Sequence, residues 1–88
     1  MKITFDPTKN AANIIKHDVS LDAASRIEWK TLYSKQDTRH DYGEERMIGY
    51  AYIGLRLFCV VYTDRDDVRR IISLRKANAR EVKYYADT

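Results

Sequence analysis

Basic side chains are concentrated in the last third of this 88-residue chain, where a predicted strand leads directly into a short helix. Val68–Lys83 holds six basic residues and one acidic residue, a net charge of +5, so the rest carries −2 of the total of +3. Arg75 and Lys76 end the predicted strand, and Asn78 and Arg80 begin the helix. Guanidinium groups and helix N-termini both bind phosphate, which favours nucleic acid as a ligand. A solvated basic face explains the charge equally well.

Two other segments carry groups that can transfer protons. His17 follows Lys16 at the predicted end of a helix, where the helix dipole favours the protonated imidazole, a possible general acid. The same pair can equally serve only as a basic helix terminus. Glu45 and Arg46 lie where a polar loop becomes a strand. A carboxylate there can act as a base or orient a cation, or it can form only a weak surface ion pair.

The composition gives little support to other kinds of chemistry. Two histidines in separate segments and one cysteine match no metal-site spacing, and no Walker or dinucleotide motif is present, so neither a metal nor a cofactor is expected. Cys59 is expected in the core. The longest apolar run, Leu57–Tyr62, is too short to cross a membrane, and Met1–Asp6 lacks the apolar part of a signal peptide. These features predict a cytoplasmic protein without membrane association.

The N-terminal half predicts a strand and two helices within one domain that spans residues 1–88. Ile3–Phe5 alternates as a short strand does. Asp6 suits a helix N-cap and Pro7 the first turn of a helix that ends at His17. The apolar stripe of that helix, which we expect to be buried, consists of Ala11, Ile14 and Ile15. A second helix is expected after Ser20, with Leu21, Ala24, Ile27 and Trp29 on its buried side.

The C-terminal half predicts a meander of strands at residues 46–53, 55–63 and 68–75, followed by a helix at 77–86. A weaker strand is indicated at 31–34 and a polar loop at 36–45. Short turns make successive strands antiparallel neighbours. The expected fold is α+β: a short N-terminal strand, two helices packed on one face of an antiparallel sheet of about four strands, and a C-terminal helix. We expect function on the open second face.

Four ordered blocks that span nearly the whole chain resemble the BrnT family of toxins. They are Phe5–Asn10; Asn13–His17 with Val19–Ala24; Tyr42–Arg46 with Gly49; and Ile71–Asn78 with Arg80, Glu81 and Tyr84. One departure is Asp18, because the family usually has Gly after the Lys-His pair. A left-handed turn at this position is less comfortable for Asp than for Gly.

The resemblance implies the toxin half of a bacterial type II toxin–antitoxin pair, a ribonuclease with a RelE/ParE-like fold. It also implies a cognate DNA-binding antitoxin, commonly in a heterotetramer that represses its own operon, so that operator DNA is contacted indirectly through the antitoxin. Transferred motif by motif, the implied functional residues are Lys16, His17, Glu45, Arg46, Arg75, Lys76, Asn78 and Arg80.

These residue types suit metal-independent cleavage of RNA by its own 2′-hydroxyl, which would inhibit translation and growth. In this hypothesis Arg75 and Arg46 stabilise the charged phosphorane, and His17, or Glu45 if it is closer, exchanges protons. The RNA-binding residues are Lys16, Lys76, Asn78 and Arg80. The alternatives are a non-enzymatic RelE/ParE-fold toxin or a corepressor that acts by protein–protein binding.

Overall fold

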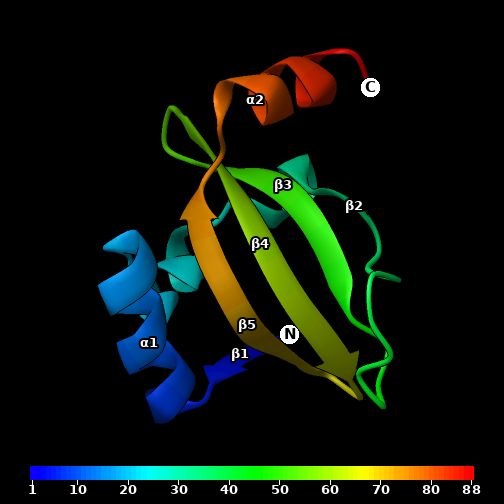
Figure 1. Ribbon diagram of the computed structural model, residues 1–88. Coiled ribbons are helices and arrows are strands. Elements are labelled where there is room, and N and C mark those ends of the chain that lie inside the picture. Colours follow the sequence, from blue (N-terminus) through cyan, green and yellow to red (C-terminus); the bar gives the residue numbers. More distant parts are fainter.

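A five-stranded mixed sheet forms the centre of the computed structural model, which describes residues 1–88 (Figure 1). The strand order is β1-β5-β4-β3-β2, with β1 parallel to β5 and all other neighbours antiparallel. The strands are β1 (Lys2–Phe5), β2 (Tyr33–Gln36), β3 (Met47–Ile53), β4 (Arg56–Arg65) and β5 (Val68–Lys76). The α+β class and the β3–β5 meander were predicted correctly, but the expected four-stranded antiparallel sheet was wrong. Most of the chain separates β1 from β5, so no turn motif signals their parallel pairing.

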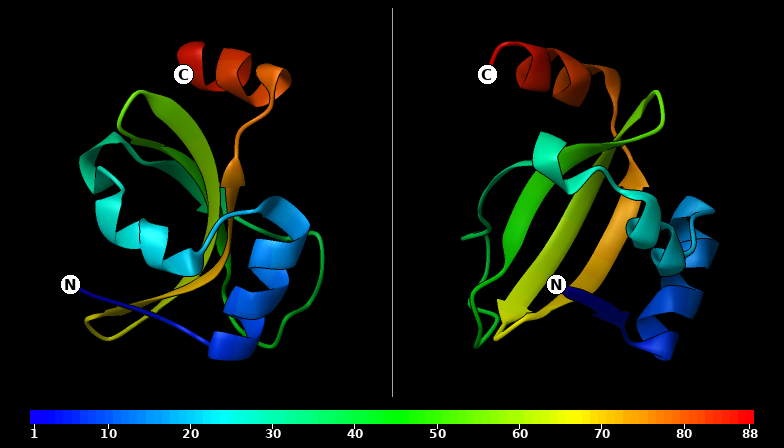
Figure 2. Two further views of the ribbon diagram at one scale, coloured as in Figure 1. Left: turned by 90° about the vertical axis from the view of Figure 1, so that its left-hand side faces the viewer. Right: turned by 180° about the vertical axis from the view of Figure 1, so that it is seen from behind.

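Two short 3₁₀ helices, η1 (Leu21–Arg26) and η2 (Trp29–Thr31), cover one face of the sheet (Figure 2). The Ser20 hydroxyl caps η1 by accepting a hydrogen bond from the Asp22 amide at 3.3 Å, as its position predicts. The buried residues Leu21, Ala24 and Ile27 recur every three residues, a spacing that puts them on one side of a 3₁₀ helix. The core between these helices and the sheet also contains Ala51, Phe58, Val60, Tyr62, Ile71 and Leu74.

Helix α1 (Pro7–His17) begins as predicted but faces the opposite way. Asp6 caps it by accepting a hydrogen bond from the Thr8 amide at 2.8 Å. The expected buried stripe is wrong, since Ile15 is 88% exposed and Ile14 is 42% exposed, whereas Asn13 is buried. The helix packs along the edge of β5 and not on a sheet face, so its inward residues must satisfy backbone groups (Figure 2).

Asn13 satisfies those groups by taking the place of a neighbouring strand. β1 pairs with β5 only as far as Ile71, which leaves the backbone of Leu74 at a free edge. The Asn13 side chain accepts a hydrogen bond from the Leu74 amide at 3.2 Å and donates one to its carbonyl at 2.8 Å. It also donates to the Val19 carbonyl at 2.8 Å. A buried amide therefore fixes α1, and His17 with it, beside β5.

Asp18 ends α1 in the left-handed conformation, with φ 56° and ψ 34°, and its amide donates to the Ile14 carbonyl at 2.8 Å. The turn is thus present despite the departure from glycine. We expect Asp18→Gly to raise the free energy of unfolding by about 0.5–1 kcal/mol, because glycine adopts this conformation without strain and removes an anion from a helix C-terminus. Thermal unfolding should show Tm raised by roughly 2–8 °C.

The variant Asp18→Asn separates the two causes, since it removes the charge and keeps a side chain. It should give less than half of the gain. A lower Tm for Asp18→Gly would contradict the strain assigned to this turn.

Gly49 in β3 lets the paired strand β2 approach closely. A Cβ atom at this position would lie 2.7 Å from the Ser34 Cβ and 2.9 Å from the Tyr33 carbonyl oxygen. Helix α2 (Ala79–Ala86) then crosses the end of the sheet, where the Tyr85 hydroxyl donates to the Thr31 carbonyl at 2.6 Å (Figure 1). None of the helices is both long and apolar enough to span a bilayer.

Candidate functional site on the open face of the sheet

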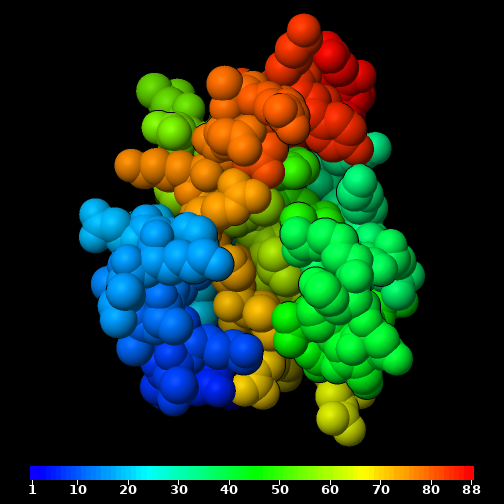
Figure 3. Space-filling view, viewed as in Figure 1, coloured from blue at the N-terminus to red at the C-terminus, as the bar shows by residue number.

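The face of the sheet opposite η1 and η2 is open and hollowed. Figure 3 shows parts of β4 and β5 exposed in a furrow between α1 and the segment that contains residues 36–48, with α2 at one end. We call this furrow the groove. Separate hollows of about 230 and 210 Å³ lie against its β2 and α1 sides. The open face expected from the sequence is therefore present and concave.

A row of four side chains crosses the floor of the groove at the end nearest α2. Arg75 pairs with Cys59, Cys59 with Tyr50, and Tyr50 with Tyr33, so all four project from the same face. Cys59 is 2% exposed, and burial raises the pKa of its thiol to about 11. The thiol is therefore protonated and buried, as predicted for Cys59. The side chains of the row that can contact a ligand are Arg75 and the tyrosines.

Glu81 of α2 holds Arg75 in place. The Arg75 Nη1 and Nη2 atoms donate to the two carboxylate oxygens at 2.7 and 2.8 Å. The same carboxylate accepts hydrogen bonds from the Asn78 amide at 2.9 Å and from the Tyr50 hydroxyl at 3.2 Å. Hydrogen bonding from Arg75 lowers the pKa of Glu81 to about 2, so the pair is ionised throughout the physiological range. The guanidinium is consequently fixed in position before any ligand arrives.

Arg75 keeps donors for a ligand despite this ion pair. A guanidinium has five N–H groups, and Glu81 uses the end formed by Nη1 and Nη2. The Nε–H has no partner in the structure, and with the second Nη2 hydrogen it forms the lateral donor pair. Two phosphate oxygens fit that pair. The side chain is 31% exposed, so the open groove gives access to it.

His17 lies on the α1 side of the groove, close enough to Arg75 for their charges to interact. Lys16 and His17 line the 210 Å³ hollow together with Ser73, which shares the sheet face of Arg75. Partial burial lowers the pKa of His17, and the charges of Lys16 and Arg75 lower it further. The expectation from the helix dipole, a more readily protonated imidazole, is therefore wrong. A neutral imidazole suits a general base better than an acid.

Glu45 and Arg46 lie toward the other end of the sheet. The Glu45 carbonyl accepts from the Thr63 hydroxyl at 2.9 Å, and Thr63 pairs with Arg70 on β5. Arg70 and Arg75 are five residues apart on that strand, roughly 16 Å. Arg46 stacks on the Tyr42 ring at 4.1 Å and donates to Glu44 at 3.3 Å. The structure therefore places His17 within electrostatic range of Arg75, and it brings neither Glu45 nor Arg46 to this end of the groove.

The three remaining predicted residues surround α2 in different ways. Lys76 pairs with Phe58, a core residue, so it projects from the opposite face to Arg75. The Asn78 side chain caps α2 by accepting from the Glu81 amide at 2.9 Å, a structural role that commits its oxygen. Arg80 is exposed and lines a hollow of about 330 Å³ with Asn78, Lys35, Tyr50, Glu81 and Tyr84. Arg80 and the side-chain amide nitrogen of Asn78 can therefore reach a ligand in this hollow, whereas Lys76 faces away from it.

Glu81 and Lys35 are members of the site that the sequence did not indicate. The capping box that joins Asn78 to Glu81 was the available signal, because Asn followed three residues later by Glu marks a helix start and places that carboxylate near the strand end. No carboxylate lies within ion-pair distance of Lys16, Lys35 or Arg80. His, Cys, Asp and Glu side chains nowhere gather in threes that could hold a metal ion.

Known proteins match this chain both in sequence and in fold. The model of the family described as the ribonuclease toxin BrnT of type II toxin–antitoxin systems matches residues 5–81, so the chain belongs to this family, as its sequence blocks predicted. The fold is similar to the crystal structure of the Brucella abortus ribonuclease toxin BrnT at 1.1 Å resolution. That match has a TM-score of 0.69 and 23% identity, and it covers 89% of this chain and 97% of the other. No match was found among curated proteins.

Proposed function

We propose that this chain cuts RNA at the groove by in-line attack of the ribose 2′-hydroxyl on the adjacent phosphate, without a metal ion. The observation that carries the proposal is that His17 lies on the open side of the sheet within electrostatic range of an arginine whose orientation is fixed by Glu81. A base and a phosphate-binding cation on one concave face are the two groups that this reaction requires. Membership of a family of ribonuclease toxins supports the reaction class.

In the proposed reaction the neutral imidazole of His17 accepts the proton of the 2′-hydroxyl. The 2′-oxygen forms a bond to phosphorus, the bond to the 5′-oxygen breaks, and the leaving oxygen takes a proton from water. The products are a 2′,3′-cyclic phosphate and a 5′-hydroxyl end. Arg75 donates its lateral N–H pair to the phosphorane oxygens, whose charge increases in the transition state. Glu81 positions Arg75 without contacting the RNA.

Exposed cations along the groove hold the neighbouring phosphates in this proposal. Lys16 and Arg80 border the Arg75 end, and Arg46 with Glu45 belongs to the far end, where it meets the RNA several nucleotides away. Asn78 contacts the same part of the RNA as Arg80 through its side-chain amide nitrogen, whereas Lys76 projects from the opposite face and adds only to the positive charge of the strand end. Such contacts position the RNA and make its binding dependent on salt.

The partner assignments rest on the family. A type II system pairs a toxin with an antitoxin, and we propose that a cognate DNA-binding antitoxin neutralises this chain in a heterotetramer. Operator DNA is then contacted through the antitoxin. Inhibition of translation and growth follows from loss of RNA until the antitoxin binds.

The test is cleavage of single-stranded RNA by the purified protein in excess EDTA, measured across pH. We expect cleavage in EDTA with a rate that is level at neutral pH and falls only below pH 6.5, because His17 has a lowered pKa and acts in its neutral form. His17→Ala should reduce the rate about 10²–10⁴-fold and remove the acid limb.

The matched control is the chain's other histidine, since His40→Ala changes an exposed loop residue and should leave both the rate and the pH profile unaltered. Absence of RNA cleavage would refute the proposed activity, and loss of cleavage in EDTA would refute metal independence. Full activity of His17→Ala would remove its role as the base.

A further inference from the structure

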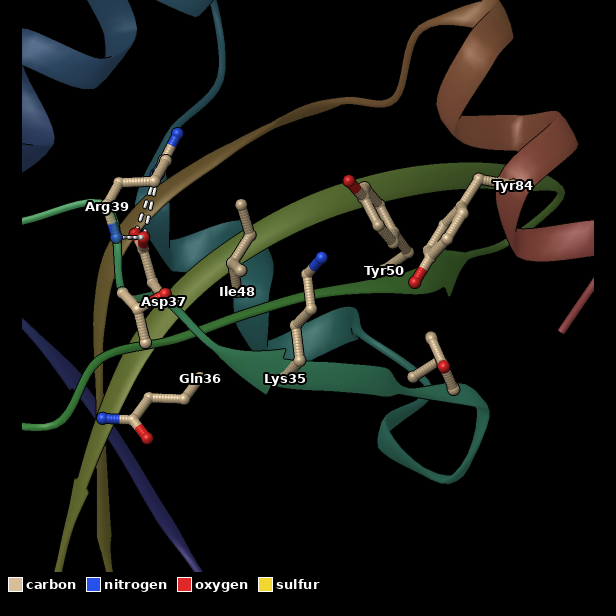
Figure 4. A pocket seen from close by; sticks show the side chains of 9 residues that line it. Lys35, Gln36, Asp37, Arg39, Ile48, Tyr50 and Tyr84 are labelled. Atoms are coloured by element: carbon tan, nitrogen blue, oxygen red, sulfur yellow. Dashed lines mark hydrogen bonds and ion pairs between the residues drawn. The ribbon is translucent and has the colours of Figure 1, made fainter.

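Three tyrosines and a lysine line a cavity of about 230 Å³ on the β2 side of the groove, which we call the tyrosine cavity. Tyr33 and Lys35 come from β2, Tyr50 from β3 and Tyr84 from α2. In Figure 4 the Lys35 side chain rises between Ile48 and Tyr50, and Tyr84 faces Tyr50 from the neighbouring helix. Tyr50, which lines the cavity, belongs to the same cross-strand row as Arg75. The backbones of these two residues are two strand spacings apart, about 10 Å.

The rings of the cavity leave aromatic surface free. Tyr84 lies 6.1 Å from Tyr33 and 6.1 Å from Tyr50 between ring centroids, with inclined planes in both pairs. Tyr33 remains 44% exposed and Tyr84 42% exposed. Aromatic side chains of this size are normally covered more fully in a small domain, so the exposed rings form a platform on which a planar group can stack.

The charges around the rings favour an anionic chain as the source of that planar group. The Lys35 ammonium lies 5.9 Å from the centre of the Tyr84 ring and has no carboxylate partner. The buried Asp37 carboxylate accepts from Arg39 Nε at 2.8 Å and Nη2 at 2.7 Å, which neutralises it. Arg39 itself is 65% exposed at the rim of the cavity. Cations therefore border the aromatic surface, and the buried carboxylate beside it is neutralised.

We infer that the tyrosine cavity binds one nucleobase of a nucleotide that flanks the phosphate held by Arg75. The inference rests on the proposed function for the identity of that phosphate. Pockets for drug-sized ligands have volumes of about 300–1,000 Å³. The tyrosine cavity is smaller, a size that suits a single ring system. Stacking on tyrosine tolerates any base, and Lys35 and Arg39 contact the attached phosphates and base oxygens.

The test compares binding of two fluorescent single-stranded DNA 12-mers, oligo(dT) and a chain with abasic sites, by anisotropy. DNA lacks the 2′-hydroxyl, so binding is measured without cleavage. We expect the wild-type protein to bind the base-containing strand at least about fivefold more tightly than the abasic strand. Tyr84→Ala and Tyr33→Ala should each reduce that ratio toward one and leave the affinity for the abasic strand nearly unchanged.

Two controls keep the result interpretable. Tyr84→Phe retains the ring and should keep most of the preference, and Ile15→Ala removes an exposed apolar side chain on the far side of α1 and should keep all of it. The two alanine variants lie on different elements, so one still tests the cavity if the other unfolds. An unchanged ratio in a folded variant would overturn the inference and leave the cavity to a protein ligand, whether or not the wild type cleaves RNA.

Discussion

Replacing Arg75 by Ala should slow RNA cleavage by about 10²–10³-fold, the largest effect expected of any single residue apart from His17. Arg75 is the one arginine of the groove whose guanidinium is fixed by two short hydrogen bonds and still has a free lateral donor pair. Arg75→Lys should recover only a small part of the rate, because an ammonium cannot donate a bidentate pair in a fixed plane. Single-turnover cleavage of a labelled RNA measures both.

Arg69 provides a matched control on the same strand. It also makes a two-point ion pair, to Asp64 at 2.7 and 2.9 Å, but it stacks between Trp29 and Tyr62 on the covered face. Arg69→Ala removes the same charge and should leave the cleavage rate within about threefold while lowering Tm. Equal losses of rate in the two variants would show that net charge, and not the geometry at Arg75, determines activity.

Glu81→Gln separates positioning from binding. The Gln oxygen can still accept a hydrogen bond from the Asn78 amide, and the Gln amide nitrogen can donate to the Tyr50 oxygen, but the substitution removes the anion opposite Arg75. We expect tighter RNA binding, since a negative charge leaves the groove, together with a lower kcat, since the guanidinium is held less firmly. A fall in both KM and kcat is the pattern of a positioning residue, whereas a purely structural role would lower the amount of folded protein alone.

Asn13→Ala should lower the free energy of unfolding by about 3 kcal/mol. The substitution leaves the amide and carbonyl of Leu74 and the carbonyl of Val19 without these hydrogen-bond partners. That loss is a large share of the stability of a small domain. Thermal unfolding should show Tm lowered by roughly 12–24 °C. The expected loss is similar to that of truncating a buried Leu to Ala, although Asn13→Ala removes a polar side chain and no apolar core.

The control lies two residues further along the same helix. Ile15→Ala deletes more apolar surface, yet its side chain is 88% exposed, and the change in unfolding free energy should stay within about 0.5 kcal/mol. The sequence pattern of α1 predicts the reverse order, with the isoleucine buried and the asparagine in solvent. Denaturant titration of the two variants therefore decides which face of the helix meets β5.

Much of the fold followed from local signals. The caps Asp6 and Ser20 and the short turns that join β3, β4 and β5 each depend on a few neighbouring residues, and the sequence predicted them correctly. The parallel pairing of β1 with β5 was not predictable in this way, since it joins Lys2 to Val68 across the length of the chain. Nor was the orientation of α1, because hydrophobic periodicity assumes that a helix packs on apolar side chains and not on a strand edge.

The site was predictable in its parts and not in its assembly. Sequence indicated Arg75 and His17 individually, from a basic strand end and a basic helix end, and the fold places them together. Side chains alternate between faces along β5, so Lys76 lies on the opposite face to Arg75. A count of charges does not distinguish the two faces. The separation of Arg46 from Arg75 depends on where β3 begins relative to β5, a register that only the assembled sheet defines.

The amide of Asn13 has a consequence for how the molecule meets other chains. An unpaired strand edge is a template on which a second polypeptide can add its own strand and start aggregation. By satisfying both backbone groups of Leu74 with one side chain, α1 closes that edge without extending the sheet. Any partner that extended the sheet along this half of β5 would first have to displace the helix that carries His17.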